Sequence, residues 1–376
     1  MSTATTDNPL GLDGIEFIEF ASPDPEALRQ TFLAFGFSRV ARHVTRAVDL
    51  YVQNDIRFLL NGEPGSAGAS FARQHGPSIA SMGLRVKDAP RAIDAARSRG
   101  ASVVPGGDLE RADGTKVPAV RGVGGSLVYL VDRYEEAKRW ESLGFVALET
   151  PDLVAPKGFL AIDHLTNNVE KGTMPRWKAF YETVFGFREV RYFDIRGAKT
   201  GLTSFALRSP CGKFCIPINE ADEAKSQINE FIEQYRGPGI QHLAFTTGDI
   251  LGSLRALEGS SLSFLDIDDA YYAEVFTRVP HVTEDHAEIR ARNVLVDGDG
   301  DGYLLQIFTK PLCGPIFIEL IQRKNHLSFG EGNFGALFRS IERDQARRGV
   351  FDADGSAGGG TQNLPSGAGS ARDPAH

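Results

Sequence analysis

The sequence predicts an α+β fold in which one βαβββ plan occurs twice. Two observations indicate this: three pairs of segments resemble each other in the same order along the chain, and each pair repeats the same strand and helix patterns. With 376 residues, the chain is long enough for two domains of ordinary size. We expect domains at 1–150 and 151–351, with a linker around ETPDLVAPKG (149–158) and a Gly- and Ser-rich disordered tail at 352–376.

The first pair of segments opens each half. GIEFIEFASPDPEALRQTFLAFGFSRV (14–40) and AIDHLTNNVEKGTMPRWKAFYETVFGFREV (161–190) both predict a strand, a helix and a second strand. The helices are expected from the spacing of their apolar residues. Gly36 and Gly186 are expected to end them, because glycine readily adopts the left-handed conformation found at helix ends.

The other two pairs complete the repeat. IASMGLRVKDAPRAIDAARSRGA (79–101) resembles IQHLAFTTGDILGSLRALEG (240–259), and both predict a strand that leads into a helix. SLVYLVDRY (126–134) resembles PIFIELIQRK (315–324), and both predict a strand. The two halves therefore contain the same elements in the same order.

Composition and charge restrict the function classes. A net charge of -8 and an isoelectric point near 5.6 argue against nucleic-acid binding. No apolar stretch approaches the length needed to cross a bilayer, and MSTATTDNPLGL at the start does not resemble a signal peptide. Three cysteines, Cys211, Cys215 and Cys313, do not suggest a disulfide framework. We expect a cytoplasmic protein without membrane or nucleic-acid partners.

Placing the repeats over each other reveals three differences. His164, His242 and Glu319 in the second half stand opposite Phe17, Ser81 and Tyr129 in the first, with a slip of one residue open at Ser81. Each of these positions has a possible metal ligand in the second half alone. Each also falls on a predicted strand, which holds ligands more precisely than a loop.

Two histidines and one carboxylate are the ligands of a non-haem Fe(II) facial triad. Catalytic zinc uses the same residue types, so the residues alone leave the metal open. A buried histidine taken singly is more often a core residue with satisfied ring nitrogens. Glu319 is less ordinary, because it lies in the apolar strand IFIEL and a buried glutamate needs a partner. Loss of all three residues from the first half favours the metal interpretation.

Several motifs resemble those of a known family. AIDHLTNNV, GIQHLAFTT, LLQIFTKPL, GPIFIELIQRK and FGEGNFGALFRSIERDQARRG, with GIEFIEFASPD near the start, are similar to segments of the 4-hydroxyphenylpyruvate dioxygenase family. This family lies within the vicinal oxygen chelate superfamily. The resemblance implies paired βαβββ units that form open barrels, a structural N-terminal domain and a catalytic, iron-binding C-terminal domain.

The resemblance also implies the residues of the site. The metal ligands would be His164, His242 and Glu319, holding one Fe(II) per chain. Catalytic roles would fall on Ser204, Asn219, Gln241, Gln306 and Phe334. The other substrate-pocket residues would be Pro217, Gln227, Phe308, Phe317, Phe329, Gly330, Asn333 and Leu337.

The reaction implied by the resemblance is the conversion of 4-hydroxyphenylpyruvate and O2 to homogentisate and CO2, a step of tyrosine catabolism. Three alternatives stay open: a 4-hydroxymandelate synthase, an extradiol ring-cleaving dioxygenase, and a small-molecule binding protein on the same fold. Pro217 and Phe334 resemble the homogentisate-forming pattern rather than the synthase. We also expect a homo-oligomer, a dimer or a tetramer.

Some residues of the expected site have two interpretations. Phe308, Phe317 and Phe334 would form a dry wall against an aromatic substrate, or would simply pack in the core. Gln241 and Gln306 would orient the substrate, or would satisfy each other. The final predicted helix, 333–348, would gate the cavity or cap it permanently.

Overall fold

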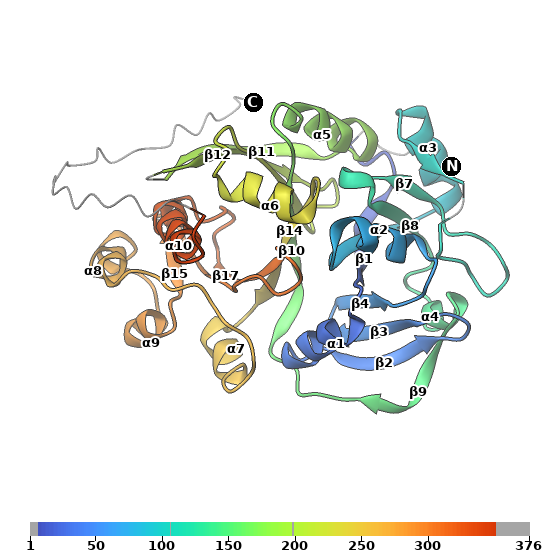
Figure 1. Cartoon of the computed structure of the whole chain (residues 1–376), viewed down its shortest axis with the longest axis horizontal. Helices are drawn as coiled ribbons and strands as arrows, with labels where there is room; N and C mark the ends of the chain where they lie inside the picture. The colour runs from blue at the N-terminus through green and yellow to red at the C-terminus, as the bar shows by residue number, and fades with distance from the viewer. Residues whose placement is uncertain (1–6, 106, 198, 351–376) are drawn as a thin grey trace.

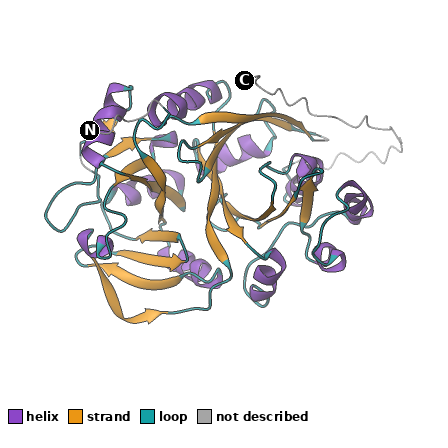
Figure 2. Ribbon diagram, turned by 180° about the vertical axis from the view of Figure 1, so that it is seen from behind, coloured by secondary structure: helices purple, strands orange, loops and turns teal. Residues whose placement is uncertain are grey.

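The computed structural model describes residues 7–105, 107–197 and 199–350, and the predicted tail at 352–376 lies outside them. The chain forms two halves that lie side by side, the N-terminal half running from blue to green and the C-terminal half from light green to red in Figure 1. Each half contains one mixed sheet, and Figure 2 shows the strands of both sheets curving. No helix in the described part of the chain is long and apolar enough to cross a membrane.

The N-terminal sheet has nine strands in the order β6-β7-β8-β5-β1-β4-β3-β2-β9. These strands are β1 (Leu12–Ala21), β2 (Ser38–His43), β3 (Val48–Gln53), β4 (Ile56–Asn61), β5 (Ser78–Val86), β6 (Val103–Val104), β7 (Ala119–Arg121), β8 (Leu127–Val131) and β9 (Phe145–Asp152). The helices of this half are α1 (Pro25–Ala34), α2 (Ala67–His75), α3 (Ala89–Ser98), the 3-10 turn η1 (Val123–Gly125) and α4 (Arg139–Ser142).

The C-terminal sheet has eight strands in the order β11-β12-β13-β10-β14-β17-β16-β15. These strands are β10 (Phe159–Asn168), β11 (Arg188–Arg196), β12 (Gly201–Arg208), β13 (Cys215–Glu220), β14 (Gly239–Thr247), β15 (Leu295–Gly298), β16 (Tyr303–Phe308) and β17 (Phe317–Lys324). The helices are α5 (Met174–Phe180), the π-helical turn η2 (Tyr181–Phe185), α6 (Gln227–Tyr235), α7 (Ile250–Ala256), α8 (Asp269–Arg278), α9 (His286–Ala291), the 3-10 turn η3 (Glu331–Asn333) and α10 (Phe334–Arg347).

The two sheets share the same central pairing. In the first, β1 pairs parallel with β4 and antiparallel with β5, which pairs parallel with β8. In the second, β10 pairs parallel with β13 and antiparallel with β14, which pairs parallel with β17. This agreement in strand order and direction confirms the predicted duplication.

The strand register also confirms the predicted equivalences. In the C-terminal half, His164 pairs with Ala244, and Ala244 pairs with Glu319. In the N-terminal half, Phe17 pairs with Gly83, and Gly83 pairs with Tyr129. His242 pairs with Thr166, just as Ser81 pairs with Glu19, so Ser81 is the counterpart of His242 without a slip.

Helix ends follow the predicted glycine signals. Asp24 caps the start of α1 by accepting a hydrogen bond from Ala27 N, and the chain leaves the helix at Gly36 with a positive φ of 83°. The second repeat continues from α5 into η2 and stops at Gly186, which has a left-handed conformation. Both glycines allow the sharp turn into the next strand.

The segment between the halves is shorter than predicted. β9 extends to Asp152 and pairs with β2, so the first residues of the expected linker at 149–158 belong to the N-terminal sheet. The halves then share one apolar core. Phe245 of β14 contacts the rings of Phe35, Phe37 and Phe58, which come from the other half. This shared core holds β14, which carries His242, in place between β10 and β17.

Candidate metal centre

Three neighbouring strands bring the predicted ligands together. His164 lies on β10, His242 on β14 and Glu319 on β17, and their ligand atoms all lie within 4.8 Å of one another. Ala244, between His164 and Glu319 in the sheet, has only a methyl side chain and leaves room between them. His164 and Glu319 are buried, while the side chain of His242 is partly exposed.

The distances between the ligand atoms suit a single metal ion. His164 Nε2 lies 3.1 Å from Glu319 Oε2 and 3.4 Å from His242 Nε2, and His242 Nε2 lies 3.6 Å from Glu319 Oε2. At metal–nitrogen distances of about 2.1 Å, adjacent ligand atoms lie about 3.0 Å apart in an octahedron and about 3.4 Å apart in a tetrahedron. The triangle therefore fits a bound metal, while its dimensions do not choose between the two geometries.

His164 is oriented from behind by a carboxylate. Its Nδ1–H donates to Asp163 Oδ1 at 2.9 Å, which turns Nε2 toward the other ligands. Burial by itself lowers the pKa of His164, but the nearby carboxylates of Glu319 and Asp163 raise it to about 9. Nε2 can bind a metal only without its proton, so metal binding displaces that proton.

Asp163 is itself held by Arg323. Burial alone would raise the pKa of Asp163, but hydrogen bonds from Arg323 and His164 keep it well below its usual value. Asp163 therefore stays ionised and supports the ring of His164 as a charged acceptor. Carboxylates behind metal-binding histidines commonly fix the ring and increase its basicity.

His242 is oriented by a different pair of side chains. Its Nδ1–H donates to Gln241 Oε1 at 3.1 Å, and Thr166 Oγ1 lies 3.0 Å from Nε2. The ring of Phe317 stacks on the imidazole of His242, with centroids 4.7 Å apart. Burial, followed by the charge of nearby His164, lowers the pKa of His242 well below its usual value. His242 is therefore neutral, the form that ligates metals.

Glu319 presents one oxygen to the histidines and the other to an amide. Oε2 faces His164, while Oε1 accepts a hydrogen bond from Gln306 Nε2 at 2.9 Å. Gln241 and Gln306 thus contact His242 and Glu319 respectively, and no hydrogen bond between the two amides is present among the described residues. The alternative in which the two amides satisfy each other is wrong, because each contacts a candidate metal ligand instead.

A cavity of about 100 Å³ opens in front of the three ligands. α10 covers it with the apolar face predicted from its sequence, and aromatic rings form much of the wall. Of the predicted site residues, Ser204, Pro217, Asn219, Gln227, Gln241, Gln306, Phe308, Phe317, Phe329, Phe334 and Leu337 line the cavity together with the three ligands.

Two predicted pocket residues lie behind the wall rather than in it. Asn333 is buried, and its Nδ2 donates to Gln306 Oε1 at 3.0 Å. Gly330 has a positive φ of 79°, and a Cβ on it would lie 2.0 Å from Gln306 Oε1. Both residues therefore touch the cavity through Gln306.

The cavity also contains residues outside the predicted site set; of these, Phe338 and Ile341 belong to the apolar face predicted for the final helix. Thr166 follows His164 by two positions, so the alternation of side chains along a strand could have found it. Phe193 on β11 contacts the ring of Phe334 at 5.2 Å, but nothing local distinguishes it from other core phenylalanines. The complete set of additional lining residues is Thr166, Phe193, Ile195, Leu202, Phe338 and Ile341.

Comparisons with known proteins show the family to which the chain belongs. The family model described as hydroxyphenylpyruvate dioxygenase, N-terminal, matches residues 6–146, and that of the glyoxalase/bleomycin resistance protein/dioxygenase superfamily matches 161–307. A 4-hydroxyphenylpyruvate dioxygenase from Pseudomonas aeruginosa is 48% identical over 92% of this chain and 97% of that protein. The chain belongs to the 4-hydroxyphenylpyruvate dioxygenase family. It is thus an enzyme, a dioxygenase with an α+β vicinal oxygen chelate fold.

Two further relatives show the breadth of this family. Protein MelA from Shewanella colwelliana is 54% identical over 93% of this chain and 100% of its own length. A solved structure of a mutant 4-hydroxymandelate synthase from Streptomyces coelicolor superposes with a TM-score of 0.77 at 25% identity, covering 89% of this chain and 99% of that one. The fold of this chain is therefore similar to that of a 4-hydroxymandelate synthase as well.

In the N-terminal half of this family member, aromatic side chains stand where the C-terminal half has metal ligands. A Cβ on Gly83 would lie 2.4 Å from the ring of Phe17, so glycine is needed there to admit the ring. Tyr129 packs against Phe17 with centroids 6.1 Å apart, and its hydroxyl accepts a hydrogen bond from Asp108 N. Aromatic side chains thus occupy the positions that correspond to His164 and Glu319.

Proposed function

We propose that the chain is an Fe(II)-dependent dioxygenase that converts 4-hydroxyphenylpyruvate and O2 to homogentisate and CO2. The observation that carries this proposal is the His164, His242 and Glu319 triangle, which opens onto a largely aromatic cavity. Three protein ligands of these types leave coordination positions free for substrate. The Pseudomonas aeruginosa relative, which carries this enzyme name, supports the choice of substrate.

Iron held by these three residues would supply open coordination positions and a redox-active centre for O2. The electrons would come from the substrate, two from oxidative decarboxylation of its 2-oxo acid and two from hydroxylation of its ring. The donor set fits this role, because two neutral imidazoles and one carboxylate suit Fe(II). Zinc has the same ligand preferences, but it has no redox chemistry and could not drive a reaction that consumes O2.

The chain itself would bind and orient the substrate. Phe308, Phe317 and Phe334 supply flat apolar surfaces for an aromatic ring. Ser204, Asn219 and Gln227 lie in the same cavity and offer hydrogen-bonding groups. We assign them hydrogen bonds to the polar groups of the substrate, since polar groups of a bound ligand that lack a partner are costly.

The cavity wall would also exclude water. α10 places Phe334, Leu337 and Phe338 over the opening, and Phe329 packs beside His164 with ring centroids 5.7 Å apart. A closed apolar site protects reactive species from water and strengthens the electrostatic interactions inside.

The test is anaerobic loading with Fe(II), followed by O2 uptake with 4-hydroxyphenylpyruvate and identification of the product. Homogentisate and CO2 formed with one O2 per substrate would support the proposal. His164→Ala should lose both iron binding and turnover. The matched control is His281→Ala, an exposed histidine beside Tyr303 that should leave both unchanged. Turnover retained in His164→Ala would contradict the ligand assignment.

A second candidate is 4-hydroxymandelate synthesis from the same substrate. It is favoured by the structural similarity to the Streptomyces coelicolor synthase. The product distinguishes the two: hydroxymandelate as the main product would overturn our proposal. Ring cleavage of catechols would instead indicate the extradiol dioxygenase. An absence of O2 uptake with metal bound would indicate the binding protein.

Formation of homogentisate would place the enzyme in tyrosine catabolism. The expected homo-oligomer, a dimer or a tetramer, stays a prediction that sedimentation of the purified chain would test.

A further inference from the structure

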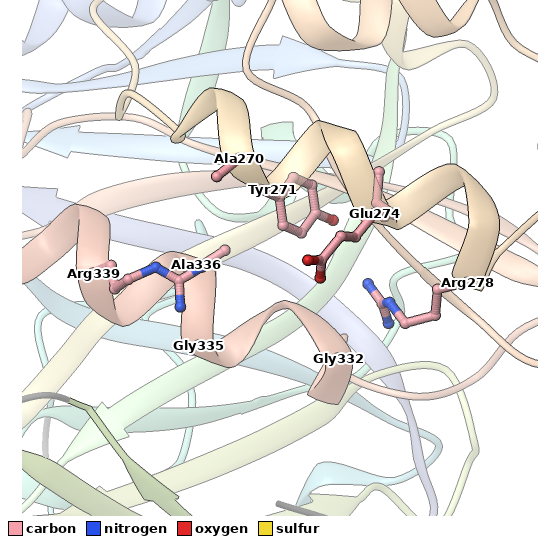
Figure 3. Close-up of a pocket in the computed structure, with 9 residues that line it drawn as sticks. Ala270, Tyr271, Glu274, Arg278, Gly332, Gly335, Ala336 and Arg339 are labelled. Carbon is pink, nitrogen blue, oxygen red and sulfur yellow. The ribbon is translucent and has the colours of Figure 1, made fainter. Parts of the chain in front are cut away.

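A line of hydrogen bonds connects a surface helix to the candidate metal centre. Tyr271 belongs to α8, and its side chain points toward the turn that precedes α10 (Figure 3). Its hydroxyl lies 2.7 Å from Asn333 Oδ1. Asn333 Nδ2 donates to Gln306 Oε1 at 3.0 Å, and Gln306 Nε2 donates to Glu319 Oε1 at 2.9 Å. All four side chains are buried.

The orientation of Gln306 follows from its neighbours. Its Nε2 lies between two acceptors, Glu319 Oε1 at 2.9 Å and Phe329 O at 3.2 Å. A flipped amide would point its own oxygen at both of them. Gln306 therefore donates toward Glu319 and presents Oε1 to Asn333.

The same reasoning fixes Asn333. Its Nδ2 must face Gln306 Oε1, so its Oδ1 faces the hydroxyl of Tyr271. In the described part of the chain, this oxygen has no other hydrogen-bond donor. Without Tyr271, a buried carbonyl oxygen would be left unsatisfied, and Asn333 would be free to rotate away from Gln306.

The proton of Tyr271 has two possible acceptors, Asn333 Oδ1 and Val296 O at 2.8 Å. Val296 O already accepts from Arg278 Nη2 at 2.9 Å, and Val296 N donates to the tyrosine oxygen. We therefore infer that the hydroxyl of Tyr271 donates its proton to Asn333 Oδ1, which has no other donor in the described part of the chain. Burial raises the pKa of Tyr271, so the phenol stays protonated and remains a donor.

We propose that Tyr271 is a positioning residue for the metal centre: through Asn333 and Gln306 it holds Glu319 Oε1 away from the metal, so that Oε2 alone is the ligand. This inference rests on the metal binding assumed under the proposed function. Its physical basis is that a carboxylate oxygen engaged by a fixed amide is less available for a second metal bond. A single carboxylate ligand atom keeps one more coordination position open for substrate.

The experiment compares Tyr271→Phe with Tyr272→Phe. Both changes remove one buried hydroxyl from α8 and keep the ring, but the hydroxyl of Tyr272 donates to Val294 O and does not touch Asn333. Anaerobic titration with Fe(II), and with Co(II) as a spectroscopic substitute, measures metal affinity apart from activity. We expect about a 10-fold loss of affinity in Tyr271→Phe, the lower end of the range for residues behind metal ligands.

The visible spectrum of bound Co(II) provides a second readout. In Tyr271→Phe, Glu319 should be able to bind through both oxygens, which changes the coordination number and therefore the absorption bands. Tyr272→Phe should lose similar stability and keep the wild-type affinity and spectrum. This control separates positioning from a general loosening of α8.

A double-mutant cycle tests whether Tyr271 acts through Gln306. In the background of Gln306→Met, which removes the amide at similar size, Tyr271→Phe should cause no further loss of metal affinity. Independent, additive losses would overturn the proposed path. If Tyr271→Phe does not fold, Asn333→Ala interrupts the same line of hydrogen bonds one step nearer the metal. It should likewise lower metal affinity about 10-fold, with no further loss in the Gln306→Met background.

The outcomes separate the two proposals. A wild-type chain that binds neither metal ion would overturn the proposed function and the inference with it. Normal metal binding in the wild type, with unchanged affinity and Co(II) spectrum in Tyr271→Phe, would overturn the inference alone.

Discussion

Arg323 binds both carboxylate oxygens of Asp163, with Nε 2.9 Å from Oδ2 and Nη2 2.8 Å from Oδ1. The pair is largely buried, and Asp163 Oδ1 also accepts the Nδ1–H of His164. A two-point contact between guanidinium and carboxylate fixes the plane of the carboxylate. β10 and β17 are thus connected twice: by Asp163 and Arg323 behind the candidate metal centre, and by His164 and Glu319 within it.

Asp163→Asn should weaken metal binding by about 10- to 100-fold. The amide has no charge to stabilise His164, and Arg323 loses its buried partner. Isothermal titration with Co(II) under anaerobic conditions measures the change. Asp49→Asn is the matched control, because Asp49 is likewise held by arginine side chains, those of Arg39 and Arg42, but lies in the other half. Equal affinity of Asp163→Asn and the wild type would exclude the supporting role.

Gly330→Ala should disrupt the metal centre without touching a ligand. Its Cβ would lie 2.0 Å from Gln306 Oε1, and the positive φ of 79° disfavours alanine in any case. We expect a loss of metal affinity of at least about 10-fold, measured in the same titration. Gly335→Ala is the control, since its Cβ would meet Arg339 at an ordinary 3.5 Å. Similar losses in both variants would point to a general effect on the start of α10.

Glu342→Ala should loosen α10. Glu342 Oε1 accepts hydrogen bonds from Lys199 N at 2.9 Å and from Thr200 N at 3.0 Å, which ties the helix to the connection between β11 and β12. Loss of this acceptor should reduce the free energy of unfolding by about 1–3 kcal/mol. We also expect faster amide exchange in α10 and a higher KM, with metal affinity retained. Glu342→Gln keeps an acceptor and should behave like the wild type; an unchanged KM in Glu342→Ala would argue that α10 is a fixed cap.

Glu19→Gln should stabilise the protein increasingly as pH rises. Burial raises the pKa of Glu19 above its ordinary 4.5, although hydrogen bonds from Ser81 and Asn61 oppose the change. The folded state therefore holds this proton more tightly than the unfolded state, and stability falls as pH increases from about 4.5 through the folded pKa. Glutamine imitates the protonated acid and removes this loss.

Thermal unfolding between pH 4 and pH 8 measures the effect. The difference in Tm between Glu19→Gln and the wild type should be small at pH 4 and grow toward pH 8. Glu16→Gln on the same strand is the control, because Glu16 binds Arg85 and Arg139 and its neutral replacement should destabilise the protein. A difference that stays constant with pH would contradict the assignment of a raised pKa.

Much of the fold followed from local patterns. The apolar spacing of the first helix, the stop at Gly36 and the repeat of strand-like segments were sufficient to predict α1, β1, β10 and their relation. The predicted linker was partly wrong, since β9 continues to Asp152. Pairing with β2 decides that boundary, and a distant strand leaves no signal in the local sequence.

The site divides in the same way. His164, His242 and Glu319 stood out because their counterparts in the other half are Phe17, Ser81 and Tyr129, and the strand register confirms each comparison. A repeated fold provides its own internal reference. Tyr271 was not found, since what distinguishes it is a buried contact with Asn333, 62 positions along the chain.

The sequence by itself determined the duplicated plan and the residue types of the metal centre, because strand alternation, helix spacing and repeat differences are properties of the linear chain. Only the tertiary structure decided how those ligands are supported. Asp163 and Arg323 lie 160 positions apart, and Tyr271 and Asn333 lie 62 apart. Contacts of that range are set by how the sheet curves and where α8 and α10 pack, since hydrogen bonds depend on distance and direction in space.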